Sequence, residues 1–464
     1  MVNNILQKIV ESWQYNEPSL CTFDELLEWI ETRNRTTAVE TQRIRLEDSD
    51  AWFYDREEGS IRNQKRSFFH IAGYQRIMQG GQVISQPIII QEEIGYLGIL
   101  CKEIKGIMHF LMQAKIEPGN INKIQVSPTI QATKSNFTQR HGGGVPPYLE
   151  YFLNAQKYEV IVDQIQSEQS SRFYKKRNRN IIIYVDEEVP VLPSHRWMTL
   201  RQIKLLMRED NLVNMDTRTV LSCIPFSKLN LSPLSLSKIS DCFQDKALFR
   251  SVFLGDGHNK LPEIYQYINN WKMFQNMEYK LLPLHELDDW EMRGNEFVCK
   301  HPYPFKVIFC DISIEGREVR HWTQPLFEAT GIATFGLICC EENGVLKFLV
   351  KAISEVGCFD GLELGPTVQR EAVVSEQKED AVFKFFSDCL KCGKGILFDH
   401  LLSEEGGRFY QEQNRNVLIK VNIQDLPKLP GGYFLLDYRT LNELVQINNV
   451  LNIQLRNLLS LLEA

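Results

Sequence analysis

Alternating apolar and polar residues predict two neighbouring strands in the first half of the chain, over residues 109–117 and 124–133. The intervening turn, with the sequence PGN, predicts an antiparallel pair that buries one face. The other face is polar and carries His109, Gln113, Lys115, Glu117, Gln125, Ser127, Thr129, Gln131 and Thr133. Such a face is ordinarily a solvated surface. Its density of directional donors and acceptors also suits a ligand rich in hydroxyl groups, such as a sugar.

Helical patterns flank these strands. Thr22 and Glu25 form a capping box before an apolar-faced helix. Further helices are predicted near 147–154, 198–210 and 261–274, and a strand at 180–185. Because these elements interleave without regular βαβ spacing, the pattern predicts a mixed α+β fold.

The chain repeats itself at an offset of 236 to 238 residues. Fifteen of 46 positions are identical in the longest matching block, and 11 of 23 in the second block. The matched blocks are 86–131 with 324–369, 163–185 with 399–421, and 211–222 with 449–460. So long a period indicates two copies of one domain rather than a solenoid.

The matching stops in a stretch rich in Ser, Lys and Leu with weak periodicity. We therefore predict a first copy at 1–230, a linker with a short helix at 231–258, and a second copy at 259–464.

The composition argues against several classes of protein. The 464 residues carry a formal net charge of −7, whereas nucleic-acid-binding proteins concentrate basic charge on a surface. No apolar window approaches 18 residues, so no membrane span is predicted, and the N-terminus lacks the features of a secretory signal. Eleven scattered cysteines fit a reducing cytoplasm. Cys389 and Cys392 form a CxxC without the companion ligands that zinc requires, so no metal site is predicted.

Cofactor and phosphate motifs are also scarce. The chain has no GxGxxG, Walker A or HExxH motif, which gives no support to a redox cofactor or to ATP hydrolysis. The basic segment 172–179 keeps only Arg408 and Arg415 in the second copy. Arg172 and Arg179 are therefore candidates for a phosphate contact or for a buried ion pair.

Three segments carry a family resemblance: "QPIIIQEEIGYLGIL" to "RHGG" (86–143), "SEQSSRFYKKRNRN" (167–180) and "NMDTRTVLSC" (214–223). Together they resemble the NDP-hexose 2,3-dehydratases, bacterial enzymes of deoxysugar biosynthesis, over nearly the whole chain. The sequence departs from the family at Ile84, where a tryptophan usually precedes "QP"; Trp322 keeps it in the second copy. The resemblance implies a homodimer with two Nudix-like domains per subunit, each with a nucleotide-sugar pocket, of which one is catalytic. It also implies a dTDP-4-keto-6-deoxyhexose as substrate.

The implied reaction requires no cofactor. The C4 ketone acidifies the C3 proton, and after deprotonation the C2 hydroxyl leaves to give a 3,4-diketo-2,6-dideoxy sugar, which a 3-ketoreductase would consume. The enzyme needs a base, an acid and donors around the C4 oxygen. We predict Lys115, Glu117 and His109, on one strand face, as this catalytic set. Ile353 replaces Lys115 in the second copy, so chemistry is expected in the first.

Binding residues are predicted for both copies. Trp52 and Trp290 correspond, each after acidic residues, and are expected to stack on the nucleotide base; core positions are the alternative. The other substrate-binding candidates are Gln125, Ser127, Thr129, Gln131, Thr133, Lys134, Ser135, Asn136, Phe137, Ser171 and Arg172. The second pocket is predicted to contain Trp290, Gln369, Arg370 and Arg408.

Two other functions stay open. A Nudix-like nucleotide-sugar hydrolase is one, although the chain carries no Nudix box. A non-catalytic nucleotide-sugar binding protein is the other.

Overall fold

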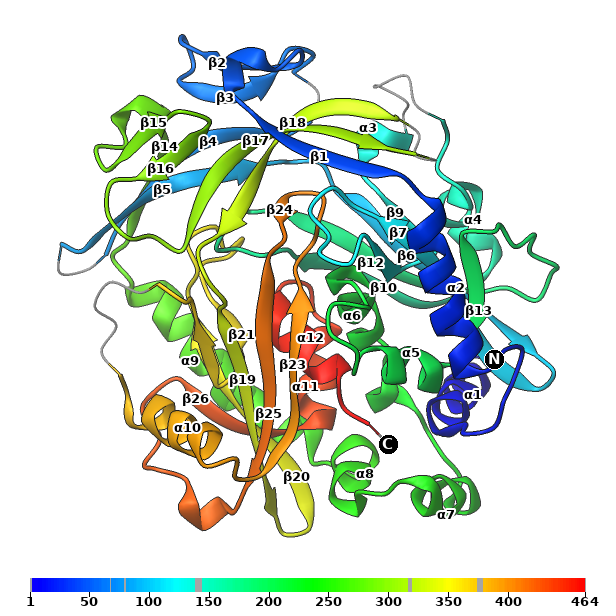
Figure 1. Ribbon diagram of the computed structural model, residues 1–464. Helices are drawn as coiled ribbons and strands as arrows, with labels where there is room; N and C mark the ends of the chain where they lie inside the picture. The colour runs from blue at the N-terminus through cyan, green and yellow to red at the C-terminus, as the bar shows by residue number, and fades with distance from the viewer. Residues whose placement is uncertain are drawn as a thin grey trace.

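The computed structural model describes residues 2–66, 68–78, 81–137, 144–315, 319–373 and 379–463. Two large mixed sheets, flanked by helices, and two smaller sheets at one end build the molecule (Figure 1). Every helix in the described part of the chain is too short or too polar to cross a bilayer.

Each copy contributes one large sheet of seven strands. The first runs β10-β12-β6-β7-β13, with β8 on β7 and β9 on β6, and the second runs β21-β20-β19-β25-β23, with β22 on β19 and β26 on β20. The first large sheet comprises β6 (Gly95–Ile104), β7 (Ile107–Ile116), β8 (Ile124–Ser127), β9 (Ile130–Ala132), β10 (Glu159–Ser167), β12 (Arg177–Tyr184) and β13 (His195–Met198). The second comprises β19 (Thr334–Glu342), β20 (Val345–Ile353), β21 (Glu363–Gly365), β22 (Val368–Arg370), β23 (Ile396–Ser403), β25 (Gln413–Val421) and β26 (Tyr433–Asp437).

The predicted strand at 124–133 is divided in the structure. β8 pairs with β7, whereas β9 pairs with β6, and Pro128 lies between them. Because proline has no backbone N–H to donate to a ladder, the strand breaks at this residue.

Helices cover both faces of each large sheet. One continuous apolar core joins the inner faces of the two sheets and therefore joins the two copies. The helices in this core are α1 (Val2–Gln14), α2 (Phe23–Thr36), α5 (Leu200–Leu206), α6 (Met215–Ser222), α7 (Pro233–Cys242), α8 (Lys246–Phe253), α9 (Leu261–Phe274), α11 (Tyr438–Val445) and α12 (Ile453–Ser460). On the outer faces lie α4 (Leu149–Leu153) and α10 (Ala381–Lys391), and α3 (Lys134–Phe137) is a single turn. The capping box predicted at Thr22 and Glu25 is present.

The two smaller sheets exchange a strand between the copies (Figure 1). The first comprises β2 (Trp52–Asp55), β3 (Ser60–Asn63), β4 (His70–Ile77), β5 (Val83–Ile90) and β11 (Phe173–Tyr174). The second comprises β15 (Trp290–Arg293), β16 (Glu296–Cys299), β17 (Phe305–Ile314), β18 (His321–Ala329) and β24 (Phe409–Tyr410). β1 (Val39–Ile44) of the first copy pairs with β17, and β14 (Glu278–Leu282) of the second copy pairs with β4.

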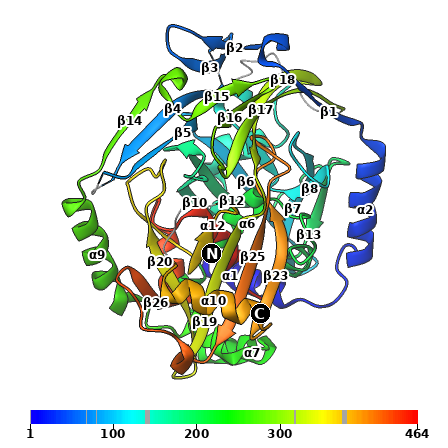
Figure 2. The same cartoon turned by 60° about the vertical axis from the view of Figure 1, so that its left-hand side comes forward.

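The exchange covers an edge that each copy leaves open. β3 pairs with β4 only at Ile71 and His70, so the remaining edge, from Gly73 to Ile77, is free to receive β14. An unpaired edge is a template for another strand, and the neighbouring copy supplies that strand here. The helices that precede the exchanged strands, α2 and α9, lie on opposite sides of the molecule (Figure 2).

The smaller sheets pack on each other through a shared apolar cluster, which contains Trp52 and Trp290. Where the copies meet, Phe173 and Phe409 contact edge to face with their ring centroids 5.7 Å apart. These two residues occupy equivalent positions in the two copies, which indicates an approximate two-fold relation.

The mixed fold of two tandem copies is confirmed, and the predicted linker differs in one respect. The segment 231–258 holds both α7 and α8 rather than a single short helix. α8 is buried, and the Ser251 hydroxyl donates a hydrogen bond to the Leu346 carbonyl. The segment is therefore part of the shared core.

Candidate active site

A cavity of about 390 Å³ lies between the first large sheet and the smaller sheets. The first copy supplies most of its wall, including Trp52, Lys115 and Glu117. The second copy supplies Trp322 and Thr323 from β18 and the loop 405–408 before β24. The cavity is therefore composite and needs both copies.

A glycine contact brings the loop of the second copy to this cavity. Gly119 follows β7, and its N–H donates to the Gly406 carbonyl at 2.8 Å. A Cβ atom on Gly119 would lie 1.7 Å from the Phe409 carbonyl oxygen, so no other residue fits without a backbone shift. The contact places Glu405 and Arg408 beside the end of β7.

Arg408 belongs to this first cavity, and its predicted place in a second pocket is wrong. Its guanidinium carbon lies 4.4 Å and 4.5 Å from the ring centroids of Phe68 and Phe69. It also donates to Gln91 Oε1 at 3.4 Å. The side chain is 8% exposed at the cavity wall, where a cation can meet an anionic ligand.

Arg172 occupies the equivalent place in the other copy, which corrects its predicted place in the first pocket. Its guanidinium carbon lies 4.3 Å from the ring centroid of Phe305, and Nη2 lies 3.0 Å from Glu371 Oε1. Ser171 lies beside it, and its carbonyl accepts a hydrogen bond from Gln86. The loops that carry the two arginines both cross the boundary between the copies, and a sequence alignment of the copies does not show this crossing.

Lys115 and Glu117 form an ion pair in the cavity wall. Lys115 Nζ lies 2.9 Å from Glu117 Oε1, and their side chains are 12% and 8% exposed. Lys115 also donates to the Gln131 carbonyl at 3.1 Å. A charged pair so withdrawn from water interacts more strongly than a surface pair and is held in one geometry.

His109 lies away from this pair. Its Nε2 is 2.7 Å from Ser19 Oγ, its Nδ1 is 2.9 Å from the Ile107 carbonyl oxygen, and it is fully buried. Burial also lowers the pKa of the imidazole. The strand alternation predicts its face correctly, but the buried Leu111 separates it from Lys115 along that face. The structure therefore does not bring His109 into the predicted catalytic set.

Three members of the predicted polar face are structural. Gln125 donates to Ser403 of the second copy, Ser127 accepts from Asn214, and Thr129 accepts from the Leu100 N–H. All three are 1% exposed, so the expectation of a ligand-facing surface is wrong for them. Their hydrogen bonds satisfy buried groups and join neighbouring elements.

Residues after β9 do reach the cavity. Gln131, Thr133 and Ser135 line it, and the Ser135 N–H and hydroxyl both donate to Glu93. Lys134 is exposed on α3 and is not part of the lining. The side chains of Asn136 and Phe137 lie outside the described part of the structure.

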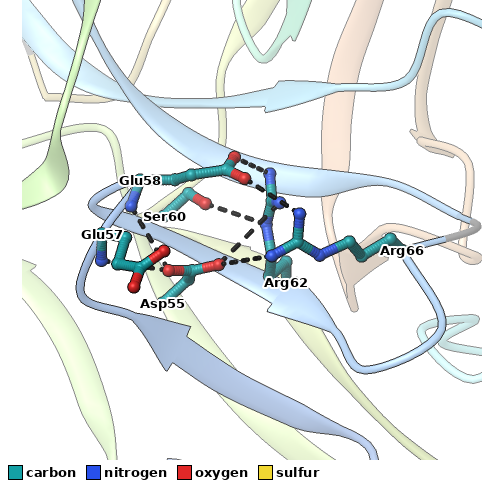
Figure 3. Close-up of polar contacts among 6 residues, drawn as sticks. All are labelled: Asp55, Glu57, Glu58, Ser60, Arg62 and Arg66. Carbon is teal, nitrogen blue, oxygen red and sulfur yellow. Dashed lines mark hydrogen bonds and ion pairs between the residues drawn. The ribbon is translucent and has the colours of Figure 1, made fainter.

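A network of charges stabilises the hairpin formed by β2 and β3 (Figure 3). Arg62 pairs with Glu58 at 2.5 Å, and Arg66 pairs with Glu58 and Asp55 at 3.2 Å and 3.4 Å. The Asp55 carboxylate also accepts the Glu57 N–H at 3.0 Å. These contacts tie the tip of the β2–β3 hairpin to the turn after β3, and Asn63, Gln64 and Lys65 at this end of β3 line the cavity.

The other residues predicted for the second pocket make packing contacts, hydrogen bonds or ion pairs with neighbouring residues of the protein. The Trp290 ring packs against Phe297, Tyr303 and Phe305, and its Nε1 donates to the Ser85 carbonyl. Gln369 bonds Glu355 and Asn452. Arg370 lies over the ring of Phe383 and pairs with Glu379.

The comparison with known proteins identifies the family. The family model for NDP-hexose 2,3-dehydratase matches residues 23–224 and again residues 261–462. The chain belongs to the NDP-hexose 2,3-dehydratase family.

Three relatives of this dehydratase chain are each named dTDP-4-dehydro-6-deoxy-alpha-D-glucopyranose 2,3-dehydratase. The protein of Saccharopolyspora spinosa is 39% identical over 94% of this chain and 90% of its own length. That of Streptomyces violaceoruber is 35% identical, over 93% and 95%. That of Amycolatopsis orientalis is 32% identical, over 95% and 90%. The resemblance carried by the sequence motifs is confirmed.

The sequence motifs do not single out four ionisable residues that line the dehydratase cavity: Glu168, Lys176, Asp216 and Glu405. Burial raises the pKa of Glu168 and lowers that of Lys176. The copies do carry a signal for three of them: Lys176 is replaced by Glu412, Asp216 by Gln454, and Glu405 by Gln169. Among the described residues, no group of three or more His, Cys, Asp or Glu side chains is arranged to hold a metal ion.

Proposed function

We propose that this chain removes the C2 hydroxyl of a dTDP-4-keto-6-deoxyhexose and forms a 3,4-diketo-2,6-dideoxy sugar. Membership of the dehydratase family supports the reaction class, and the printed names of the relatives support the dTDP-hexose. The observation that carries the chemistry is the buried Lys115–Glu117 pair in the wall of a composite cavity.

The Lys115–Glu117 pair provides two groups for removal of the C3 proton: a general base and a donor to the C4 oxygen. Glu117 takes the proton from C3 as general base, because its carboxylate lies in the cavity wall and is oriented by the ion pair with Lys115. Lys115 donates to the C4 oxygen, where negative charge develops as the enolate forms. An ammonium fixed in a water-poor cavity stabilises that charge without reorganising in the transition state.

Other cavity residues hold the nucleotide part. Trp52 and Phe68 offer aromatic surface to the base, and Arg408 offers a guanidinium to the diphosphate. Thr133 and Ser135 lie on the adjoining wall, where their hydroxyls reach the sugar. The cavity therefore has an aromatic and cationic region and a separate region for proton transfer.

The fold type, the catalytic pocket, the oligomeric state and the downstream enzyme that the family resemblance implies are part of the same proposal. We assign each copy to the Nudix-like folds, which the helices on both faces of each mixed sheet support. We assign catalysis to the first pocket and a non-catalytic role to the second. A homodimer in the cytoplasm, with a 3-ketoreductase that consumes the unstable diketone, completes the proposal.

One coupled assay tests the function. The protein is incubated with dTDP-4-keto-6-deoxyglucose, a 3-ketoreductase and NADPH, and the nucleotide sugar is analysed by mass spectrometry. We expect a dTDP-sugar that has lost one water and gained one hydride equivalent. Release of a sugar phosphate and thymidine monophosphate would instead establish the hydrolase, and tight binding without turnover the binding protein.

A substitution tests the pair. Lys115→Met keeps the length of the side chain but loses its charge, and we expect dehydration to fall by about 10²-fold or more. Ile353→Met, at the equivalent position of the second copy, is the matched control and should leave the rate unchanged. Equal losses in both variants would remove the assignment of catalysis to the first copy.

A further inference from the structure

Asp216 is held rigidly at the cavity by the start of α6. Asn214 caps this helix by accepting the Thr217 N–H at 2.8 Å, and its amide donates to Ser127 and Gln131. Thr217 in turn donates to the Val126 carbonyl at 3.0 Å. Because these bonds fix the helix start to β8 and β9, they anchor the backbone of Asp216 at the cavity lining.

The surroundings of Asp216 favour its neutral, protonated form. The residue is 2% exposed, and its Oδ1 has no hydrogen-bond partner within the described part of the protein. Burial raises the pKa of this carboxyl well above its ordinary value, and the charges of Glu168 and Glu405 raise it further. Lys115 acts in the opposite direction but does not reverse the shift. A carboxylic acid kept neutral in this way can donate a proton.

The second copy provides an internal comparison. Gln454 stands at the position of Asp216; its side chain is one methylene longer and keeps hydrogen-bonding capacity, but an amide cannot deliver a proton. The same copy also lacks the lysine of the ion pair, since Ile353 replaces Lys115. The copy without the cavity lysine therefore also lacks the cavity acid, whereas the Glu117 position is Glu355 and remains a glutamate.

We propose that Asp216 is the general acid that protonates the departing C2 hydroxyl of the sugar. This assignment deepens the proposed function and rests on it. Glu117 and Lys115 account for the loss of the C3 proton and for the enolate, but neither provides the proton that the hydroxyl needs, because one acts as base and the other holds the C4 oxygen. Asp216 provides it.

The step balances within the cavity. Glu117 removes the C3 proton, and the electron pair of that bond forms the C4 enolate. The enolate then returns its electrons as the C2–C3 double bond forms and the C2–O bond breaks, and the hydroxyl leaves as water with the proton of Asp216. Conversion of the C3 enol into the ketone moves a proton to C2 and releases one from O3. These two transfers restore neutral Asp216 and ionised Glu117.

The first test separates deprotonation from elimination in the Asp216→Asn variant. The variant is incubated with dTDP-4-keto-6-deoxyglucose in D₂O, and mass spectrometry follows both deuterium at C3 of the recovered substrate and the loss of water. We expect dehydration to fall by about 10²-fold or more while deuterium still enters at C3. Unchanged dehydration, or loss of both reactions in a folded variant, would overturn the assignment. Gln454→Asn is the matched control and should change neither reaction.

The second test replaces the leaving group. Fluoride departs as an anion and needs no proton, so the 2-deoxy-2-fluoro analogue of the substrate should bypass a missing acid. We expect Asp216→Asn to release fluoride at close to the wild-type rate, measured with a fluoride electrode. A variant damaged only in its structure would lose both activities, and that result would contradict the proposal. Failure of the wild-type protein to dehydrate the natural substrate would instead remove the proposed function, so the two failures are distinguishable.

Discussion

At the scale of single residues, Arg172 and Arg408 show how equivalent positions each make their contacts with the opposite copy. Each lies in the same motif, RFY, and each packs on phenylalanine of the other copy: Arg172 of the first copy on Phe305, and Arg408 of the second copy on Phe68 and Phe69. Arg408 lines the cavity with Lys115, whereas Arg172 pairs with Glu371. An argument from motif position alone therefore assigns the two arginines to the wrong sites.

This placement predicts different kinetics for two alanine variants. Arg408→Ala should raise KM for the dTDP-sugar by about 10- to 100-fold, because it removes a charged hydrogen-bond donor from the cavity. Arg172→Ala should leave KM close to the wild-type value and should lower Tm, because Glu371 loses its partner. Steady-state kinetics and thermal unfolding measure both effects. The assignment fails if the two variants raise KM equally.

Glu363 predicts a pH dependence of stability. It is 2% exposed, and burial raises its pKa to about 7 from an ordinary value of 4.5. The folded state therefore binds this proton more tightly than the unfolded state. The resulting stabilisation is full below about pH 4.5 and is lost as the pH rises through about 7. Glu363→Gln should therefore gain stability relative to wild type between pH 5 and pH 8, measured by guanidinium unfolding. If the difference in unfolding free energy between the variant and the wild type were the same at pH 5 and at pH 8, the prediction would be wrong.

At the scale of elements, the turns after β7 and β20 hold the copies together. Gly119 contacts Gly406, and the equivalent Gly357 donates to the Ser170 carbonyl at 2.8 Å. A Cβ atom at the two glycines would lie 1.7 Å and 1.8 Å from a backbone oxygen of the other copy. The two turns are equivalent in packing, but only the turn at Gly119 adjoins the cavity with Lys115.

Alanine at the two glycines should therefore separate stability from activity. We expect Gly119→Ala and Gly357→Ala each to lower Tm by several degrees, since the backbone must move to admit a methyl group. Gly119→Ala should also reduce kcat of the remaining folded protein, because Glu117 and Glu405 move with the turn. Gly357→Ala should spare kcat, as measured on protein purified in its folded state. Full activity in the Gly119 variant would show that the turn does not position the site.

For the helices and strands, the sequence pattern predicts some features of the structure and not others. The alternation along β7 identifies the face shared by His109, Lys115 and Glu117, and the capping box identifies the start of α2. Alternation says which residues share a face but not what covers that face, so Gln125 and Ser127 are buried against other elements. It also cannot say which edge a strand will join, and the exchange of β1 and β14 therefore has no local signal. The internal repeat alone is sufficient to predict that the fold consists of two copies of one domain.

At the scale of the whole molecule, the two copies form one structure rather than two adjoining domains. A single apolar core contains residues of both, and α6 and α12 exchange arginine contacts across it. Arg218 donates to the Ser403 carbonyl and Arg456 to the Ser167 carbonyl, each at 2.5 Å. Each copy also completes a sheet of the other. The second copy is therefore needed for the first cavity even if it performs no chemistry itself.

This interdependence predicts the behaviour of the separated halves. Residues 1–230 alone lack β14 and the loop that carries Glu405 and Arg408, and residues 231–464 alone lack β1. Each half would expose its part of the shared core and an unpaired strand edge, so we expect each to aggregate or to remain unfolded when produced alone. Coexpression of the two halves should restore a soluble pair with dehydratase activity, measured by copurification and by the coupled assay. A soluble first half that dehydrates the substrate without the second would show that the cavity does not depend on Glu405 and Arg408.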